Sequence, residues 1–214
     1  MRQVFINTDK GRREVFIPER WEEVTTAQYI KLSSEWDGKD LIRLFSILTG
    51  IPYRVIFDSH DYALEQNLIY ATAFIFEEKI DFKSLPVPET FHVKGKEVKV
   101  PKDIKGLSIG QNIHIISELQ NAQVYDQLIA LAIAIYLEPL YTGQDFNYEH
   151  AKELEQDILL MPITKTYSLG FFLLKPVMRS GRSSMMPLNR IRILLQNIFM
   201  RSVKDRRSQL EPSY

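Results

Sequence analysis

The residues with the clearest potential for chemistry lie in the segment "FDSHDY", which places Asp58, His60 and Asp61 close together. Two carboxylates and an imidazole at this spacing can approach one metal ion from a single turn. Such a site still needs further ligands, and the sequence nominates none. Asp58 and Ser59 are also favoured residues for capping the apolar helix that follows. The segment therefore predicts a helix cap rather than a metal site.

Other catalytic patterns are missing from the sequence. Gly38 and Lys39 of "WDGKD" lack the upstream glycine and the Ser or Thr of a phosphate-binding loop. The sequence contains no paired-histidine zinc motif and no nucleophile elbow. His114 lies on the apolar face of a predicted helix and is expected to be a hydrogen-bonded core residue. The chain has no cysteine, which excludes thiol nucleophiles, thiolate metal sites and disulfides. We therefore expect a protein that is not an enzyme and that holds no cofactor or metal.

Charge is distributed unevenly along the chain. Residues 1–164 carry 17 basic and 25 acidic side chains, a balance of −8, whereas residues 165–214 carry 10 basic and 2 acidic ones, a balance of +8. This pattern indicates an acidic body followed by a basic region that could contact a partner. The candidate contact residues in the basic region are Arg179, Arg182, Arg190, Arg192, Arg201, Lys204, Arg206 and Arg207.

Three interpretations of the basic region remain open. It could contact duplex DNA through phosphates without reading the bases. It could dock on an acidic protein surface, on the same chain or on a neighbour. It could also be a solvated helix face. Aromatic residues are not interleaved with the basic ones, which disfavours specific binding of single strands.

The first part of the chain reads as a β-hairpin followed by helices. "QVFINTDKGRREVFIP" alternates apolar and polar residues around a turn that contains Gly11, and the hairpin is expected to end at Pro18. Thr25 and Gln28 form a capping box, which predicts a helix start.

Two more helices are expected before the first linker. One is capped near Asp37 or Lys39 and is ended by Gly50 and Pro52. A third covers residues 59–76, and the segment "DFKSLPVPE" then reads as a linker.

The same pattern then restarts. Seven of the 22 positions from 14 to 35 are identical to those from 97 to 118. A shorter hairpin with Gly95 in its turn precedes a second capping box, formed by Ser108 and Gln111. "YDQLIALAIAIYLEP" parallels "KDLIRLFSILTGIP", including the proline stop, and "LEQDI" echoes "LEQNL".

Two interpretations of this similarity are possible. The chain could contain a tandem duplication, or two unrelated α+β segments could share common capping and turn residues. Duplication predicts an α+β fold, mainly helical, with two copies of a hairpin-plus-helices unit at residues 1–80 and 88–162. Residues 163–214 would follow as C-terminal helices and a basic arm.

The C-terminal part has no counterpart in the repeat. "YSLGFFLLKPVM" predicts a buried helix that Pro176 kinks or ends. After the joint "SGRSS", a long helix is expected from Pro187 to about Arg207. Its apolar face would carry Leu188, Ile191, Leu195, Ile198 and Phe199, and its polar face would carry Arg190, Asn197, Arg201 and Lys204.

The sequence predicts a soluble protein. Its start, "MRQVFINTDKG", does not resemble a signal peptide. The longest apolar run, residues 128–137, is about half of the length that crosses a membrane, so it is expected to form a buried helix.

The segment "IPERWEEVTTAQYIKL", together with "ILTGI" further on, resembles small structural and tail-assembly proteins of tailed phages that infect Bacteroidetes, the crAss-like phages. The resemblance covers about forty residues well. The second half keeps the pattern at Ser108 and Gln111 but has Ile104 where the tryptophan would stand. The matching residues are Pro18, Trp21, Glu22, Glu23, Val24, Thr25, Ala27, Gln28 and the run 47–51.

This resemblance implies a non-enzymatic structural protein of the virion, made in the host cytoplasm. The expected role is a homo-oligomeric ring or connector in the neck or tail that joins other neck, tail or portal proteins. One alternative is a tail assembly chaperone that leaves before the virion matures. Another is a protein of DNA packaging, in which the basic region contacts duplex DNA.

Overall fold

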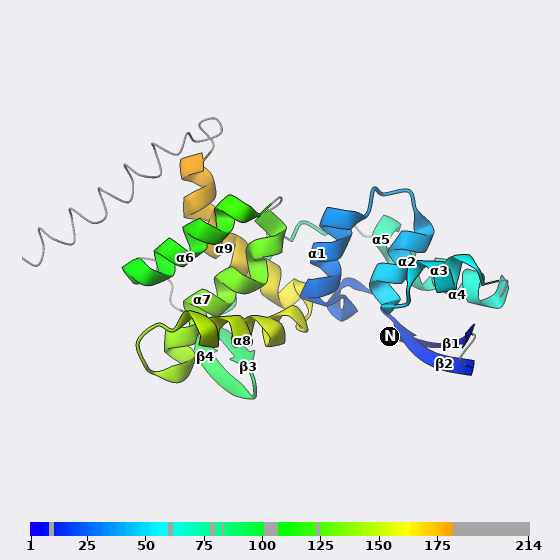
Figure 1. The fold of residues 1–214 in the computed structure, drawn as a ribbon, viewed down its shortest axis with the longest axis horizontal. Helices are drawn as coiled ribbons and strands as arrows, with labels where there is room; N and C mark the ends of the chain where they lie inside the picture. The colour runs from blue at the N-terminus through cyan, green and yellow to red at the C-terminus, as the bar shows by residue number, and fades with distance from the viewer. Residues whose placement is uncertain are drawn as a thin grey trace, which may run out of the picture. The chain divides into compact units, whose positions relative to one another are not determined.

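The computed structural model (Figure 1) describes residues 1–8, 11–59, 62–77, 80–82, 84–100, 107–122 and 125–181. The chain divides into two compact units, residues 1–173 and 174–214. The first unit combines two small antiparallel hairpins with packed helices. The predicted fold class, α+β and mainly helical, is therefore confirmed.

The first hairpin opens the chain as predicted. Strand β1 (Arg2–Thr8) pairs antiparallel with β2 (Gly11–Ile17). Successive side chains of a strand point to opposite faces, so one face of the hairpin enters the core. The buried residues on that face are Val4, Ile6, Val15 and Ile17.

Helix α1 (Thr26–Glu35) begins at the first predicted capping box, after the short helix η1 (Trp21–Glu23). The Thr25 hydroxyl accepts the amide of Gln28 at 3.2 Å, and the Gln28 side-chain oxygen accepts the amide of Thr25 at 2.8 Å. These bonds occupy two amides that a helix start leaves without partners, so this prediction is confirmed.

Helix α2 (Leu41–Thr49) starts slightly later than predicted, since its cap lies one residue after Lys39 and three after Asp37. Asp40 is the cap, and its carboxylate accepts the amide of Arg43 at 3.0 Å. The helix ends, as predicted, at Gly50, whose φ of +70° is a left-handed conformation that glycine adopts at little cost.

The next segment contains three helices where one was predicted. The chain forms α3 (Tyr53–Phe57), α4 (Tyr62–Thr72) and α5 (Phe74–Glu77), with a break at Ala73. Helix α4 packs on both strands of the first hairpin. The prediction of one continuous helix was wrong because apolar spacing alone does not mark a break between two helices that share a buried face.

The second hairpin also forms where it was predicted. Strands β3 (Thr90–Val93) and β4 (Lys96–Lys99) pair antiparallel. Lys94 and Gly95 connect them with φ of +49° and +73°, as in the two-residue hairpin turns that match strand twist. Helix α6 (Ile109–Asn121) then starts at the second capping box.

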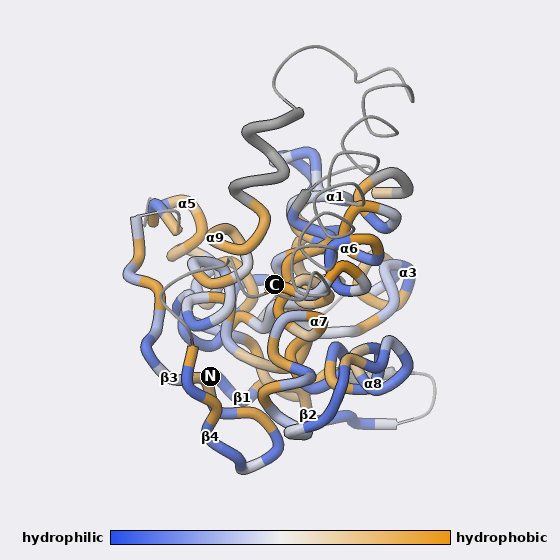
Figure 2. The backbone as a smooth tube through the Cα atoms, turned by 90° about the vertical axis from the view of Figure 1, so that its left-hand side faces the viewer, coloured by the Kyte–Doolittle hydropathy of each residue, from blue (hydrophilic) through white to orange (hydrophobic). Residues whose placement is uncertain are grey.

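Helix α7 (Ile129–Thr142) is the most buried element of the described residues. It follows η3 (Tyr125–Leu128) and precedes α8 (Tyr148–Leu159). Every residue from 128 to 138 is buried, and α6, α8 and β4 pack on the helix. Figure 2 shows the contrast between the largely apolar α7 and the mostly hydrophilic α8. The predicted buried helix is confirmed.

Pro139 lies inside α7 and does not stop it, contrary to the prediction. A proline lacks the amide that would bond to the carbonyl four residues earlier, here that of Ile135. The Gln111 side-chain amide donates to this carbonyl at 2.7 Å, while its oxygen accepts the amide of Ser108 at 2.8 Å. One glutamine thus caps α6 and replaces the missing bond of α7. The helix ends only at Gly143.

Gln28 makes the corresponding pair of bonds in the first half. Its side-chain amide donates to the Leu48 carbonyl at 2.7 Å. Leu48 lies four residues before Pro52 and in the last turn of α2, where carbonyls have no partner within the helix. The capping box of one helix is in this way joined to the end of the next.

Helix α9 (Ile163–Gly181) brings a late part of the chain to an early one. The amide of Thr26 donates to the Met161 carbonyl at 2.8 Å, and the amide of Ile163 donates to the Val24 carbonyl at 2.9 Å. Pro176 does not end the helix, which continues for five more residues. Within the described residues, no helix is both long and apolar enough to span a membrane.

Gly170 and Gly110 offer a matched pair for testing the packing of α9 on α7. A Cβ at Gly170 would lie 2.6 Å from Ile129 Cγ2 and 3.2 Å from its Cα, whereas at Gly110 the nearest atom, of Phe146, lies at 3.6 Å. We expect Gly170→Ala to lower the free energy of unfolding by about 1–3 kcal/mol. Gly110→Ala should leave it unchanged or raise it by up to about 1 kcal/mol. Urea denaturation would measure both, and equal effects would contradict this packing.

Gln111→Glu tests the bond between the glutamine and the Ile135 carbonyl. The introduced carboxyl group keeps the acceptor but, when ionised, loses the donor and is buried beside a carbonyl. We expect the free energy of unfolding to fall by about 1–3 kcal/mol at neutral pH. The loss should shrink toward pH 4, where the protonated group can donate. Gln144→Glu at an exposed site is the control, with a change within about 0.5 kcal/mol. Equal losses would show that the bond is unimportant.

Candidate functional site

An apolar groove lies between α2, α3 and α4 of the first half. It encloses about 500 Å³, within the range of protein sites that receive apolar groups. Buried side chains, including Phe45, Ile56 and Leu68, form its floor and are held by the core.

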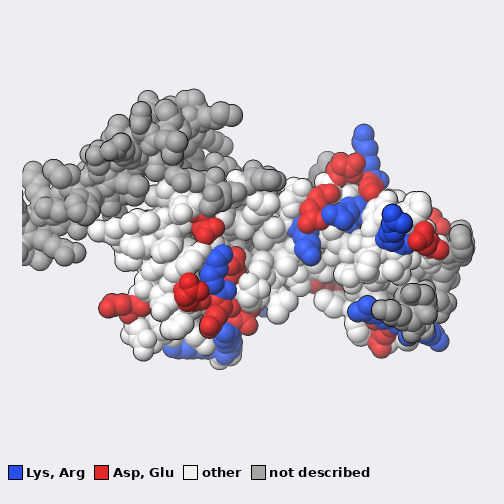
Figure 3. Space-filling view, viewed as in Figure 1, with Lys and Arg blue, Asp and Glu red and all other residues white. Residues whose placement is uncertain are grey.

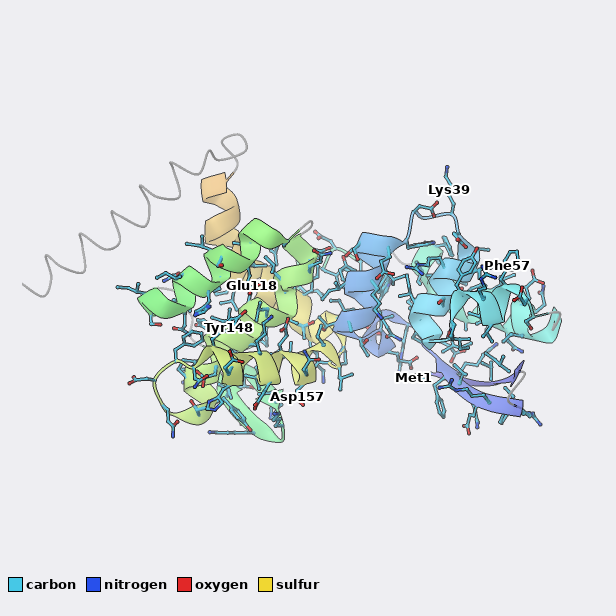
Figure 4. The ribbon with its side chains drawn as sticks, in the orientation of Figure 1. Met1, Lys39, Phe57, Glu118, Tyr148 and Asp157 are labelled. Carbon is cyan, nitrogen blue, oxygen red and sulfur yellow. The ribbon has the colours of Figure 1, made fainter. Side chains whose placement is uncertain are left out.

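The rim of the groove exposes large apolar side chains. Phe57 is 62% exposed, Ile69 42% and Leu41 40%. The Phe57 ring stacks on that of Tyr53 with centroids 6.0 Å apart, and Figure 4 labels Phe57 on this part of the structure. Isolated exposed apolar residues are common, but three around one hollow are typical of a surface that binds another molecule.

The charges near the groove are of both signs, with acidic residues in excess. Asp58 and Glu65 are exposed close to it, and Arg54 is exposed on α3. Arg43 on α2 is occupied by an ion pair with Glu35. Figure 3 likewise shows acidic and basic side chains interspersed on the face it presents. The groove therefore has an apolar centre and a mixed polar rim, as in many protein interfaces.

A cluster of aromatic rings joins the first half to the linker and to α9. Phe82 of the linker lies 5.2 Å from both Trp21 and Tyr29, and 5.4 Å from Tyr167 of α9, between ring centroids. Edge-to-face contacts of this kind add to the stabilisation from burial alone. The cluster is part of the core.

Tyr29 and Tyr167 are shifted toward their neutral forms. Burial raises the pKa of Tyr29 to about 12, and the negative charge of Asp126 adds to this effect. Burial likewise raises the pKa of Tyr167, whose hydroxyl donates to Asp126 at 3.2 Å. Both tyrosines are therefore neutral near neutral pH.

A second polar contact fastens α6 to α8. The Tyr148 hydroxyl donates to Glu118, and Figure 4 shows these two side chains together. Burial, then this hydrogen bond, raises the pKa of Tyr148. His114 stacks on the Tyr148 ring with centroids 4.1 Å apart and is half-buried, so its predicted place in the core was wrong.

Glu138 is the most deeply buried carboxylate among the described residues, with 1% of it exposed. It accepts the backbone amide of Asn147 at 3.1 Å and lies 3.5 Å from His150 Nδ1. Thr142 also donates to it at 3.4 Å. These partners satisfy the carboxylate and fix the corner between α7 and α8.

The predicted contact residues of the basic region cannot be placed around this groove. Arg179 belongs to the backbone of α9, but its side chain lies outside the described part of the chain. The other seven, from Arg182 to Arg207, lie entirely outside it. His60 and Asp61 lie outside it too, and no three His, Asp or Glu residues of the described part could hold a metal ion together.

The sequence did not identify the groove, although one signal was present. Leu68 and Ile69 are adjacent on α4 and point about 100° apart, so burying both requires a wide apolar face on that helix. Leu68 is 1% exposed whereas Ile69 is at the rim. An apolar pair that exceeds the width of the buried face could have indicated a second surface.

Comparison with models of protein families, curated proteins and solved structures gives no match in any of the three.

Tyr29→Phe tests the electrostatics of the aromatic cluster. The folded-state pKa of Tyr29 is about 12, above its ordinary value of 10, so its stabilising effect is complete below pH 10 and is lost as pH rises toward 12. The variant keeps the ring and removes this titration. We therefore expect the free energy of unfolding to fall less steeply between pH 10 and 12 in the variant, measured by urea denaturation at each pH. Parallel curves would contradict the buried state of Tyr29.

Proposed function

We propose that this chain is a non-enzymatic structural protein of a tailed-phage virion, a subunit of a ring or connector in the neck or tail. The observation that carries the proposal is the apolar groove between α2, α3 and α4. An exposed hollow with apolar walls is suited to a protein segment. The residues that match phage proteins reach the last turn of α2 at 47–49, whereas α2 lines the groove with Leu41, Ile42 and Phe45, so the resemblance and the groove adjoin on this helix.

The charge distribution supports head-to-tail assembly. The acidic balance of residues 1–164 and the basic balance of residues 165–214 make two unlike surfaces on one chain. Contacts between unlike surfaces are heterologous, and they generate closed rings when the rotation between neighbours closes. Complementary charge would orient each copy against the next.

We also propose that the two halves, residues 1–80 and 88–162, arose by tandem duplication. The bonds of Gln28 and Gln111 support it, because each glutamine caps its own helix and donates to a carbonyl four residues before a proline. Two unrelated segments would have no reason to share this combination of three distant positions.

One further correspondence supports the duplication. The "LEQ" segments both place their leucine in the core, since Leu64 is 4% exposed and Leu154 is 2% exposed. The second helix of the second half is longer, which explains why a gap-free comparison loses the similarity there.

The groove also favours a second candidate function within the same biology. A tail assembly chaperone would use an exposed apolar groove to hold a segment of another tail protein, and would then leave. The two functions share the binding surface and differ in whether the chain remains in the mature virion.

Mass spectrometry of purified particles separates the two functions. If the chain is a ring subunit, we expect its peptides in mature virions at a constant ratio to the other neck and tail proteins, after treatment with nuclease and a salt wash. A major capsid peptide provides the internal standard. Presence in infected-cell lysate together with absence from washed particles would refute the structural role and favour the chaperone.

A further inference from the structure

We propose that the groove between α2, α3 and α4 receives the terminal segment, residues 187–207, of a neighbouring copy of the same chain, bound as an amphipathic helix. The inference rests on the proposed ring and names the contact that would build it. It requires that the segment fit the groove in apolar pattern, length and charge, and that the donor be a second copy.

The apolar pattern of the terminal segment suits a helix-binding groove. Leu188, Ile191, Leu195 and Ile198 follow one another by three or four residues, the spacing at which helices insert anchors into apolar hollows. The floor of the groove is already packed, and the rim side chains Leu41, Phe57 and Ile69 are exposed. An amphipathic helix would cover these three rim residues and bury its own anchors in the same contact.

The lengths also agree. Helix α4 forms one wall with 11 residues, which is about 17 Å at roughly 1.5 Å per residue. Residues 188–199 would extend over about 18 Å as a helix. The apolar stretch of the segment therefore matches the wall, and the basic residues at its end would project beyond the groove.

Charge favours the same pairing. Residues 37–77, which build the groove, carry six acidic and three basic side chains, a balance of −3, whereas residues 187–207 carry six basic and one acidic, a balance of +5. Asp58 and Glu65 are exposed next to the apolar hollow. Exposed pairs of this kind contribute little energy each, but they steer association and set its orientation.

If a neighbouring copy donates the segment, the groove and the apolar face of the terminal segment are both buried in the same assembly. Each chain supplies this groove and one terminal segment, so a segment given to the next copy leaves the groove at one end unfilled, and a closed ring fills them all. The same contact repeats at every interface, and modest individual contacts then sum to a stable ring.

Single cysteine variants test this contact in the full chain, which has no cysteine of its own. Ile69→Cys marks the rim and Leu195→Cys marks the apolar face of the segment. The two variants carry different affinity tags, are mixed and are then oxidised. We expect a disulfide-linked species with both tags, at twice the 25.0 kDa of one chain.

Two control pairs each replace one of the two cysteines by a cysteine at a position outside the proposed contact. Asn197→Cys lies on the polar face of the segment, and Leu160→Cys is 73% exposed outside the groove. Neither Ile69→Cys with Asn197→Cys nor Leu160→Cys with Leu195→Cys should link above background. Phe57→Glu, at an exposed site, should weaken self-association by at least about tenfold while the circular dichroism stays unchanged.

Two results would overturn the inference. If Ile69→Cys and Leu195→Cys combined in one chain form only an intramolecular disulfide, and the separate variants do not link, the segment occupies its own groove. If neither arrangement links, the groove receives a different protein. Either result leaves the ring proposal intact when peptides of the chain are present in washed virions, so the two failures can be distinguished.

Discussion

The bond from Gln111 to the Ile135 carbonyl is the interaction on which the second half of the fold depends. An apolar helix such as α7 must be covered on every side, and any backbone group that it leaves unpaired is unpaired in the core. Pro139 creates such a group near the middle of the buried stretch. Gln111 satisfies it from α6 and so fixes both the position and the rotation of α6 against α7.

Local features of the fold could be predicted, and features that depend on distant partners could not. Both hairpins and both capping boxes follow from residues within a few positions of one another. The pairing of each capping glutamine with a carbonyl before a proline joins residues 20 or 24 positions apart, and spacing alone does not reveal it. The break at Ala73 and the additional helix α3 depend on packing against other elements.

The groove illustrates the same limit for the candidate site. Its floor residues are recognisable as apolar in the sequence. What made them a site is that α3 turns Phe57 outward while α4 presents Ile69 at the rim, and both follow from tertiary placement. In a sequence, such a surface is indicated by a predicted helix that has more apolar residues than its buried face can hold.

The hydrogen bonds of Thr26 set an order of events during synthesis. Its buried hydroxyl meets that of Thr166, 140 residues later, and its amide needs the Met161 carbonyl. A ribosome adds roughly 5–20 residues per second, so α1 waits about 7–28 s for these partners to be made. Until then the first half lacks its hydrogen bonds to Met161 and Thr166. Its aromatic rings, including Trp21, also lack the packing that Tyr167 and the rest of α9 provide for the aromatic cluster. The nascent chain thus passes through a period in which its N-terminal half is open to capture by other proteins in the cell.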